Sequence, residues 1–309
     1  AGVAMAMQGS CISGIDVGSA TIKLNEDGGY NLLIGAADMG TGCDTILAQM
    51  LAENMDCSVD DVAVFGADTD ASPYDSGSYA SSTTYITGKA VEKACDDLKK
   101  KLCRIAADML QVDPADVQFE GKYVRCLADD RKIPLGDIAY KTQVFSNEHA
   151  EATASHSSPV SPPPYMVGMV EIELDKETGH VEVLNVCAVV DCGIPINPAL
   201  ATIQTEGGLV QGIGHTLMEN VTINKKGKII EDNFLQYKLP TRLDMGHLKV
   251  EFEQSYEPTG PFGAKSIGEI VINTPAPALA HAIYRATGVW HRELPITPEK
   301  ILMELLQKN

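Results

Sequence analysis

The sequence has few basic residues, no long apolar run and no side chains spaced to hold a metal. Its 309 residues include 24 lysines and arginines against 42 aspartates and glutamates, a formal net charge of −18. Nucleic-acid binding by counterion release needs the opposite sign, so nucleic acid is excluded as a partner. Without an apolar stretch of roughly 18 residues, no membrane-spanning helix is expected. The seven histidines form no HExxH motif and no paired spacing, so a metal held directly by protein side chains is not expected.

The eight cysteines lack the spacings that mark zinc and iron–sulfur sites. No CxxC occurs, and Cys187 with Cys192 gives only the first interval of a plant-type iron–sulfur motif. We therefore expect free, mostly buried thiols in a reducing compartment, with any iron–sulfur cluster on another chain. The first 20 residues are small and apolar but include no basic segment, so they do not resemble a signal peptide, and we expect a cytoplasmic location.

What the sequence does contain is a globular composition and a repeated pattern. It is 44% hydrophobic and 21% charged, and its length suffices for two domains. Two β-hairpins are predicted, each followed by a glycine-containing turn and then by an apolar helix. The first set lies at 21–24, 31–36, 39–42 and 44–55, and the second at 167–174, 180–190, 191–193 and 198–219.

This repeat predicts an α+β fold made of two related α+β subdomains. The Pro/Ser-rich segment 157–164 is the predicted linker between domains at 1–156 and 165–309. Further predicted elements are a strand at 61–66, a helix at 86–110, a hairpin at 221–230, a helix at 277–287 and a last helix that begins at 298.

Small hydroxyl residues gather between Ser76 and Thr84, just before a predicted helix. Unpaired backbone N–H groups at a helix start, together with hydroxyl donors, are typical of a site for phosphate or another anion. A capped helix start after a flexible loop is the alternative interpretation.

A second candidate is the segment Gly40-Thr41-Gly42, between a predicted strand and a predicted helix. Glycine lets the backbone approach a flat or anionic ligand closely. The segment lacks the third glycine of the dinucleotide fingerprint, and a tight turn is the alternative interpretation.

The third stretch, Gln204 to Gly214, places four glycines in a predicted helix. Each costs about 1 kcal/mol relative to alanine, so another backbone or a ligand is expected to approach closely. Gln204 and Gln211, seven positions apart, share one helical face. Close helix packing and ligand contact both remain open.

The fourth stretch holds a single acid, Glu269, between Gly268 and the apolar run Ile270–Ile272. We expect a buried carboxylate there, because desolvation favours its neutral form and suits a base that works near neutral pH. The alternative is an acid that only interacts with the dipole of the following helix.

In this order, the stretches resemble the molybdopterin-binding C-terminal half of the molybdenum hydroxylases, the xanthine dehydrogenase and aldehyde oxidoreductase family. Met39–Gly42 is similar to the family's Met-Gly-Gln-Gly segment, and Ala264–Glu269 to the block that contains its catalytic glutamate. Similar blocks run from Asp68 through Thr84 to Val91, from Asn197 to Gly212, and from Thr297 to Ile301. The resemblance covers nearly the whole chain.

The resemblance implies molybdopterin, in its cytosine dinucleotide form, whose dithiolene holds molybdenum with a sulfido or selenido (selenium) terminal ligand. It implies Glu269 as the base that takes a proton from the oxygen attacking the substrate. Implied substrate-pocket residues are Gly14, Ile15 and Tyr79. Cofactor contacts are implied for Gly40, Thr41, Gly42, Ala80, Ser81, Ser82, Thr83, Thr84, Gln204, Lys265 and Gly268.

Three departures from the family pattern stand out. Thr41 replaces the usual glutamine, Ile270 replaces a common proline, and the upstream half of the molybdenum domain is not in this chain. The last departure resembles the split members of the family, above all the medium molybdopterin subunit of those that oxidise nicotinate. A large molybdopterin subunit, an iron–sulfur subunit, an FAD subunit and a small N-heteroaromatic substrate are then implied as partners. The alternatives are a purine (xanthine) or aldehyde substrate, or a non-catalytic cofactor-scaffold subunit that would have no use for Glu269.

Overall fold

The computed structural model describes residues 1–308 and has the predicted α+β fold, divided into two compact units. The first, here called the α2 unit, comprises Gly9–Pro162 and Tyr256–Ser266. The second, the α4 unit, comprises Ala1–Gln8, Pro163–Ser255 and the described residues from Ile267 onward. The chain leaves the α2 unit at Pro162, within the predicted linker.

The units nevertheless differ from two contiguous domains at 1–156 and 165–309. Residues 2–7 pair as a strand with residues 165–170, which places the start of the chain in the α4 unit. Residues 256–266 return to the α2 unit, where the backbone N–H of Phe262 donates a hydrogen bond to Glu92. Both differences arise from pairings between residues far apart in the sequence, which local composition cannot predict.

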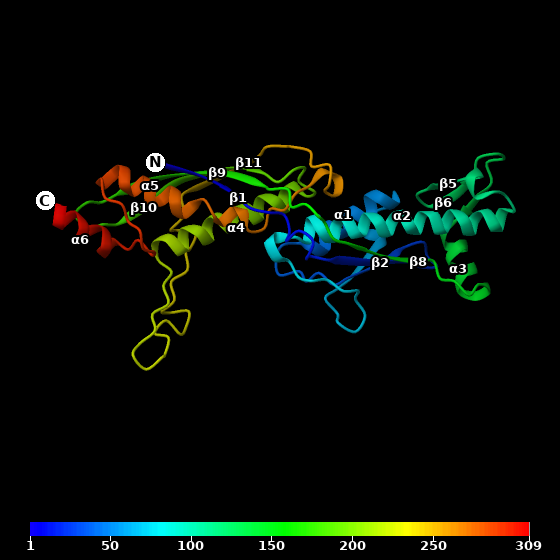
Figure 1. Cartoon of the computed structure of the whole chain (residues 1–309), viewed down its shortest axis with the longest axis horizontal. Helices are drawn as coiled ribbons and strands as arrows, with labels where there is room; N and C mark the ends of the chain where they lie inside the picture. The colour runs from blue at the N-terminus through cyan, green and yellow to red at the C-terminus, as the bar shows by residue number, and fades with distance from the viewer. Residues whose placement is uncertain (309) are drawn as a thin grey trace. The chain divides into compact units, whose positions relative to one another are not determined.

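The α2 unit is a four-stranded sheet packed against two helices. The strand order is β4 (Val62–Gly66), β3 (Tyr30–Ile34), β2 (Gly18–Leu24) and β8 (Glu151–His156), with β3 and β4 parallel and the other pairs antiparallel. The helices are α1 (Cys43–Met55) and α2 (Thr83–Leu110), and Figure 1 shows α2 running along β2 and β8. Alternating residues of β2 and β3, Ile22, Leu24, Leu32 and Ile34, are fully buried.

The same unit holds a second, three-stranded sheet that the sequence patterns did not predict. Its strands are β5 (Val117–Glu120), β6 (Tyr123–Cys126) and β7 (Lys132–Pro134), followed by α3 (Leu135–Phe145). Strands of three or four residues are too short for an alternation pattern to be recognised. Short 3₁₀ turns lie at η1 (Val59–Asp61), η2 (Tyr79–Ser81), η3 (Pro114–Asp116) and η4 (Pro261–Gly263).

The α4 unit is built in the same way. Its sheet has the order β1 (Gly2–Met7), β9 (Tyr165–Leu174), β10 (Val181–Asp191) and β11 (His247–Phe252), with β10 and β11 parallel and the other pairs antiparallel. The other elements are α4 (Pro198–Leu217), η5 (Ile270–Ile272), α5 (Pro275–Thr287) and α6 (Pro298–Lys308). The core joins Met166, Val170, Val186, Leu209 and Leu279.

The two sheets share one topology, which accounts for the repeat in the sequence. In each, a hairpin (β2–β3 or β9–β10) is followed by a helix (α1 or α4) and then by a strand parallel to the second hairpin strand. In each, an antiparallel edge strand completes the sheet on the other side, β8 in one unit and β1 in the other. The hairpin predicted at 221–230 forms no strands, only an isolated bridge between Ile223 and Ile229.

Two glycines of α4 mark close packing of the helix on η5 and on the start of α5. A Cβ atom at Gly208 would lie 2.2 Å from Cγ2 of Val271, and one at Gly212 would lie 2.7 Å from Cγ of Pro275. By contrast, a Cβ at Gly207 meets nothing within 4 Å among the described residues. Gly214 is also crowded, since a Cβ there would lie 2.1 Å from Oε1 of Glu219 and 2.7 Å from Cγ of Pro240. Close packing therefore explains three of the four glycines.

The state of the cysteines agrees with the expectation from the sequence. All eight cysteines are free, and five of them, Cys11, Cys43, Cys95, Cys126 and Cys192, are buried. Within residues 1–308, no helix has the length and apolar character needed to cross a bilayer.

Candidate functional site

In the α2 unit, the loop before α2 is fixed by Asp75. One carboxylate oxygen accepts the backbone N–H of Gly77 at 2.8 Å, and the other accepts the Thr87 hydroxyl at 2.8 Å. The backbone N–H of Ser76 donates to the carbonyl of Val17 at 2.9 Å, which ties this loop to the segment before β2. The loop is therefore held at its base while its tip carries the predicted cofactor residues.

The tip of this loop has a strained backbone. Ala80 and Ser81 have φ angles of 48° and 60°, in the left-handed region that side chains with a Cβ atom rarely adopt. Such conformations cost of order 1–3 kcal/mol each and are typical of ligand-binding segments. The hydroxyls of Ser78 and Thr83 bond each other at 2.6 Å, and Ser82 donates to the carbonyl of Gly77 at 3.2 Å.

The start of α2 presents hydroxyl groups rather than charges. Ser82 is buried at the N-cap position, where its side chain makes no cap bond to the described residues of the first turn. Ser81, Thr83 and Thr84 are half-buried around it, and Tyr79 is 60% exposed. Backbone N–H groups and hydroxyls at a helix start suit an anionic group such as a pyrophosphate.

The backbone N–H groups of the loop Gly40–Gly42 already have an acceptor within the chain. The carboxylate of Asp38 accepts N–H groups of Gly40 at 2.9 Å, Gly42 at 3.1 Å and Asp44 at 3.4 Å. The Asp38 side chain thus accepts the backbone N–H groups at the start of α1 that a ligand would otherwise bind. The exposed Thr41 and the glycine Cα atoms are what the loop still offers to a ligand.

Segment Gly9–Val17 and residues Lys265–Ser266 meet in the same unit. The hydroxyl of Ser10, which is fully buried, accepts the N–H of Ser266 at 3.1 Å and donates to the carbonyl of Pro162 at 2.6 Å. Lys265 is 7% exposed. Gly14, with φ 70°, and Ile15, 67% exposed, lie at the surface of this segment.

In the α4 unit, Glu269 lies beside Gln8 and close to α4. The side-chain amide of Gln8 donates to Oε2 of Glu269 at 2.7 Å, and the amide of Gln204 donates to the carbonyl of Gly268 at 3.0 Å. Asn273 in turn donates to Oε1 of Gln8 at 3.3 Å. The structure thus brings the predicted residues Gln204, Gly268 and Glu269 together.

The expected burial of Glu269 is wrong for this chain, because its side chain is exposed. The neighbouring Ile270 and Val271 take the buried positions, since they pack into the core next to Leu209. Glu269 precedes them at a turn, so its side chain lies on the opposite, open side. Any desolvation of this carboxylate must come from a group or chain that covers this surface.

Four residues of these sites were not found from the sequence: Gln8, Asp38, Asp75 and Asn273. The aspartates have a local signal, since each stands two positions before a glycine and accepts that glycine's N–H, as in an Asx turn. Gln8 and Asn273 have none, because their contact spans 265 positions.

Comparison with known proteins decides the family. The family described as molybdopterin cofactor-binding domain matches residues 1–246. The chain belongs to this family.

Its curated relatives agree with the assignment. The chain is 37% identical over 309 residues to the probable hypoxanthine oxidase of Escherichia coli strain K12, covering 98% of this chain and 32% of the relative. It is 32% identical over 289 residues to the gamma subunit of the 6-hydroxypseudooxynicotine dehydrogenase complex of Paenarthrobacter nicotinovorans, covering 91% and 36%. This family member therefore spans only about a third of the length of these relatives.

Solved structures show the same fold. Quinoline 2-oxidoreductase from Pseudomonas putida 86 superposes with a TM-score of 0.88 at 24% identity, covering 99% of this chain and 42% of that chain. The aldehyde oxidoreductase from Desulfovibrio gigas superposes with a TM-score of 0.79 at 24% identity, covering 99% and 32%.

The donor set of this family member fits a molybdenum bound through its pterin. Among residues 1–308, one cluster brings metal-ligating atoms within 4.8 Å of one another, and it consists of Asp38, Cys43 and Asp44. Burial, with the nearby Asp38 and Asp44 charges, raises the pKa of the Cys43 thiol to about 12, so the free thiol is protonated at neutral pH. The hydroxyls and amides at Ser81–Thr84 and Gln204 are neutral donors suited to a pyrophosphate and a pterin edge.

Proposed function

We propose that this chain is the medium molybdopterin subunit of a split molybdenum hydroxylase, with Glu269 as its catalytic base and nicotinate, as in nicotinate dehydrogenase, as its substrate. The observation that carries the proposal is the Glu269 carboxylate, oriented by Gln8 at 2.7 Å next to the Gly268 carbonyl that Gln204 holds. A scaffold subunit has no need for such an oriented acid. Membership of the family and relatives such as the nicotine 6-hydroxylase large subunit of Paenarthrobacter nicotinovorans support the substrate class.

The cofactor, molybdopterin in its cytosine dinucleotide form with molybdenum and a selenido or sulfido ligand, supplies the oxidation of the substrate carbon when bound. Ala80 and Ser81–Thr84 bind its pyrophosphate, with Gly40, Thr41, Gly42 and Lys265 alongside. Gln204 and Gly268 orient its polar edge. A carboxylate oxygen of Glu269 would accept the proton of the water-derived hydroxyl whose oxygen bonds to an electron-poor ring carbon, and the cofactor would supply the acceptor for the hydrogen and electron pair of the C–H bond that breaks. Tyr79, Gly14 and Ile15 line the substrate pocket.

A second polypeptide completes the site, and an uncovered sheet face of the α4 unit supports this. Residues that alternate with the core positions of β1 are exposed, Met5 by 75% and Met7 by 68%. Pairing places Met5 opposite Val167, and Val167 opposite Val189, so one face of the sheet carries a continuous apolar row. The face comprises Val3, Met5, Met7, Tyr165, Val167, Met169 and Val189, each at least 38% exposed.

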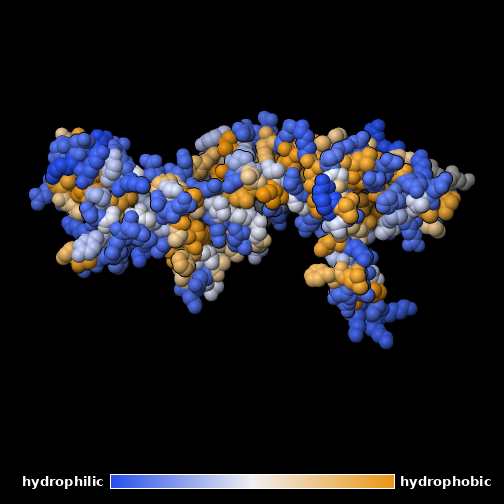
Figure 2. Space-filling model, turned by 180° about the vertical axis from the view of Figure 1, so that it is seen from behind, coloured by the Kyte–Doolittle hydropathy of each residue, from blue (hydrophilic) through white to orange (hydrophobic). Residues whose placement is uncertain are grey.

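The segment between α4 and β11 adds a further apolar surface. Phe234 is 94% exposed, Leu235 81% and Leu243 96%, and Figure 2 shows apolar side chains on this protruding segment. Contiguous exposed apolar surface of this kind marks protein–protein contacts. The occupant proposed here is the large molybdopterin subunit, because relatives of this chain are themselves chains of multi-subunit complexes, such as the gamma subunit of the 6-hydroxypseudooxynicotine dehydrogenase complex. Iron–sulfur and FAD subunits receive the electrons.

The test is metal analysis and turnover of the complex purified through this chain. Molybdenum and iron, with selenium if the terminal ligand is selenido, are expected together, with turnover of nicotinate exceeding that of hypoxanthine and of an aldehyde. Glu269→Gln is expected to lower turnover by about 10² to 10⁴ at unchanged molybdenum content, the usual contribution of a general base. Retained hydroxylation in this variant would refute the base, and a preference for hypoxanthine would favour the purine alternative.

The proposed subunit interface has a test of its own. Val167→Asp puts a charge on the apolar sheet face and is expected to abolish copurification of the large subunit. Val144→Asp, on α3, is the matched control that should keep it, since Val144 is 52% exposed and Val167 43%. Copurification with both variants would rule the sheet face out as the interface.

A further inference from the structure

Three side chains of the α4 unit form a chain that ends on the Glu269 carboxylate. Nε2 of Gln8 donates to Oε2 of Glu269 at 2.7 Å, and Nδ2 of Asn273 donates to Oε1 of Gln8 at 3.3 Å. Because the Glu269 carboxylate oxygen accepts the first of these bonds, the donor end of the Gln8 amide faces Glu269 and its acceptor end faces Asn273. The contact with Asn273 occupies that acceptor end and so supports this orientation of the Gln8 amide.

The backbone on both sides of this chain is anchored. Gln8 directly follows β1, and its N–H donates to the carbonyl of Pro164 at 3.4 Å, which extends the pairing of β1 with β9. β1 itself packs against α5 so closely that a Cβ at Gly2 would lie 2.0 Å from the carbonyl oxygen of Ala278. The position of Gln8 is thus set by the sheet and not by a mobile loop.

The partners of Gln8, Glu269 and Asn273, are the residues directly before and after η5. The N–H of Ile272 donates to the carbonyl of Glu269 at 3.2 Å, and the N–H of Asn273 donates to that of Ile270 at 3.2 Å. Ile270 and Val271 between them are each 1% exposed. The buried turn therefore keeps both side chains on the surface that faces Gln8.

We propose that Gln8 is a positioning residue for the base Glu269, and that Asn273 sets the orientation of the Gln8 amide. The inference rests on the function proposed for Glu269. A neutral amide is suited to this task, because it orients a carboxylate without adding the positive charge of a lysine or arginine. Orientation of a base relative to the reacting atoms is worth a large factor, since a misplacement of about 1 Å can cost 10²-fold in rate.

The first experiment examines the contact itself in the full-length chain. The side-chain amide of Gln8 is observed by NMR after labelling with [15N]glutamine, and it is assigned by its absence from the Gln8→Met spectrum. Glu269→Ala and Asn273→Ala are both expected to shift this signal, whereas Asp96→Ala on α2 should leave it in place. An unchanged signal in Glu269→Ala would overturn the inference.

The second experiment compares kcat with KM in the purified complex. Gln8→Met keeps the length of the side chain but removes the donor, and it is expected to lower kcat about 10- to 100-fold while KM changes less than about threefold. Asn273→Ala is expected to lower kcat by a smaller factor. Gln143→Met, at an exposed glutamine of α3, should leave both constants unchanged.

The outcomes separate this inference from the proposed function. If Glu269→Gln retains turnover, the function of Glu269 fails and the role of Gln8 fails with it. If Glu269→Gln is inactive while Gln8→Met keeps the wild-type kcat, only the positioning role is overturned. If Gln8→Met loses turnover only because it loses molybdenum or no longer unfolds cooperatively, the positioning role is also overturned, because that result indicates that Gln8 is structural.

Discussion

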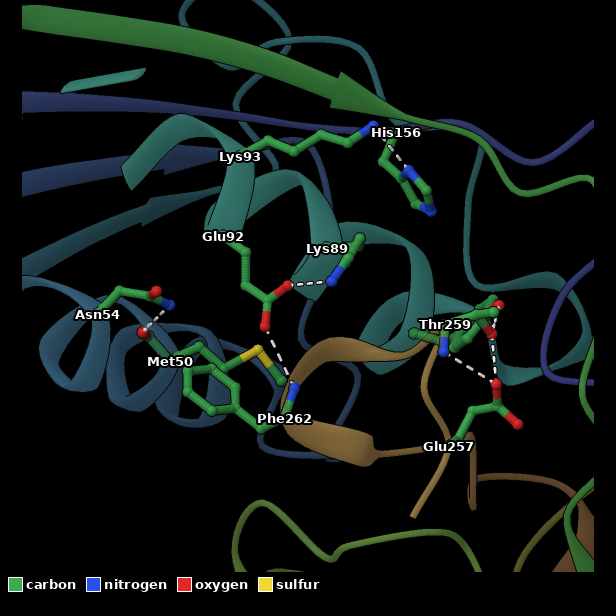
Figure 3. A network of polar contacts seen from close by, with 10 residues as sticks. Met50, Asn54, Lys89, Glu92, Lys93, His156, Glu257, Thr259 and Phe262 are labelled. Atoms are coloured by element: carbon green, nitrogen blue, oxygen red, sulfur yellow. Dashed lines mark hydrogen bonds and ion pairs between the residues drawn. The ribbon is translucent and has the colours of Figure 1, made fainter. Parts of the chain in front are cut away.

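The backbone N–H of Phe262 donates a hydrogen bond to Oε1 of Glu92, a residue 170 positions earlier in the chain, at 3.2 Å. The other carboxylate oxygen of Glu92 pairs with Lys89 at 2.5 Å (Figure 3). Phe262 has a left-handed backbone with φ 49°, and Glu92 holds it against α2. This contact attaches the segment before Lys265 to the α2 unit.

Removal of the Glu92 carboxylate is therefore expected to destabilise the α2 unit. Glu92→Ala leaves the N–H of Phe262 without its acceptor, at a cost of about 1–2 kcal/mol in the free energy of unfolding. Urea denaturation checks this, with Asp96→Ala, an exposed acid on the same helix, as the control. Equal midpoints for the two variants would contradict the assigned role of Glu92.

His156 is expected to make stability fall in mildly acidic solution. Burial, with the charges of Lys93 and Lys89, lowers the pKa of His156 to about 4, and its Nδ1 accepts a hydrogen bond from Lys93 at 2.9 Å (Figure 3). The unfolded chain binds a proton near pH 6.5 and the folded chain only near pH 4. This contribution to stability is thus complete above pH 6.5 and is lost as the pH falls toward 4.

The measurement is the difference in unfolding free energy between pH 7 and pH 4.5. His156→Gln, whose amide oxygen can still accept from Lys93, should remove about 1 kcal/mol of that difference, a value discounted for the partial exposure of the ring. An identical pH dependence in wild type and variant would show that His156 does not resist protonation.

Two adjacent glycines of α4 give predictions of opposite sign. Gly208→Ala places a Cβ 2.2 Å from Cγ2 of Val271 and is expected to lower stability by about 1–3 kcal/mol, as overpacking does. Gly207→Ala meets no described atom within 4 Å and should raise stability by up to about 1 kcal/mol, the difference in helix propensity. Thermal denaturation measures both, and stabilisation by Gly208→Ala would contradict the close packing of α4 on Val271.

Asp38 is expected to order the Gly40–Gly42 loop. Burial raises the pKa of Asp38, but N–H donors from Gly40, Gly42 and Asp44 outweigh it and lower the pKa below the usual value, so the acid stays ionised at neutral pH. In Asp38→Ala, amide hydrogen exchange at Gly40 and Gly42 should accelerate about 10-fold. This factor corresponds to the loss of a hydrogen bond that contributes about 1.4 kcal/mol. Asp70→Ala, in an exposed loop of the same unit, is the control, and unchanged protection in Asp38→Ala would count against the bonds.

The sequence by itself determined the local elements and the family. Alternating apolar residues around short polar turns predicted the hairpins β2–β3 and β9–β10, and helical periodicity with caps such as Gly288 predicted α1, α4 and α5. Both signals are short-range, because a strand or a helix face is set by neighbours within a few positions. The motif blocks, from Gly40 to Glu269, carried the family for the same reason.

Tertiary structure alone decided which distant segments meet. The pairing of β1 with β9, the return of residues 256–266 to α2 and the contact of Gln8 with Glu269 each join positions far apart in the chain. The exposure of Glu269 was decided in the same way, since Ile270 and Val271 gain more by entering the core than a carboxylate does. Desolvation depends on the atoms that surround a group in space, and no local pattern around Glu269 contains them.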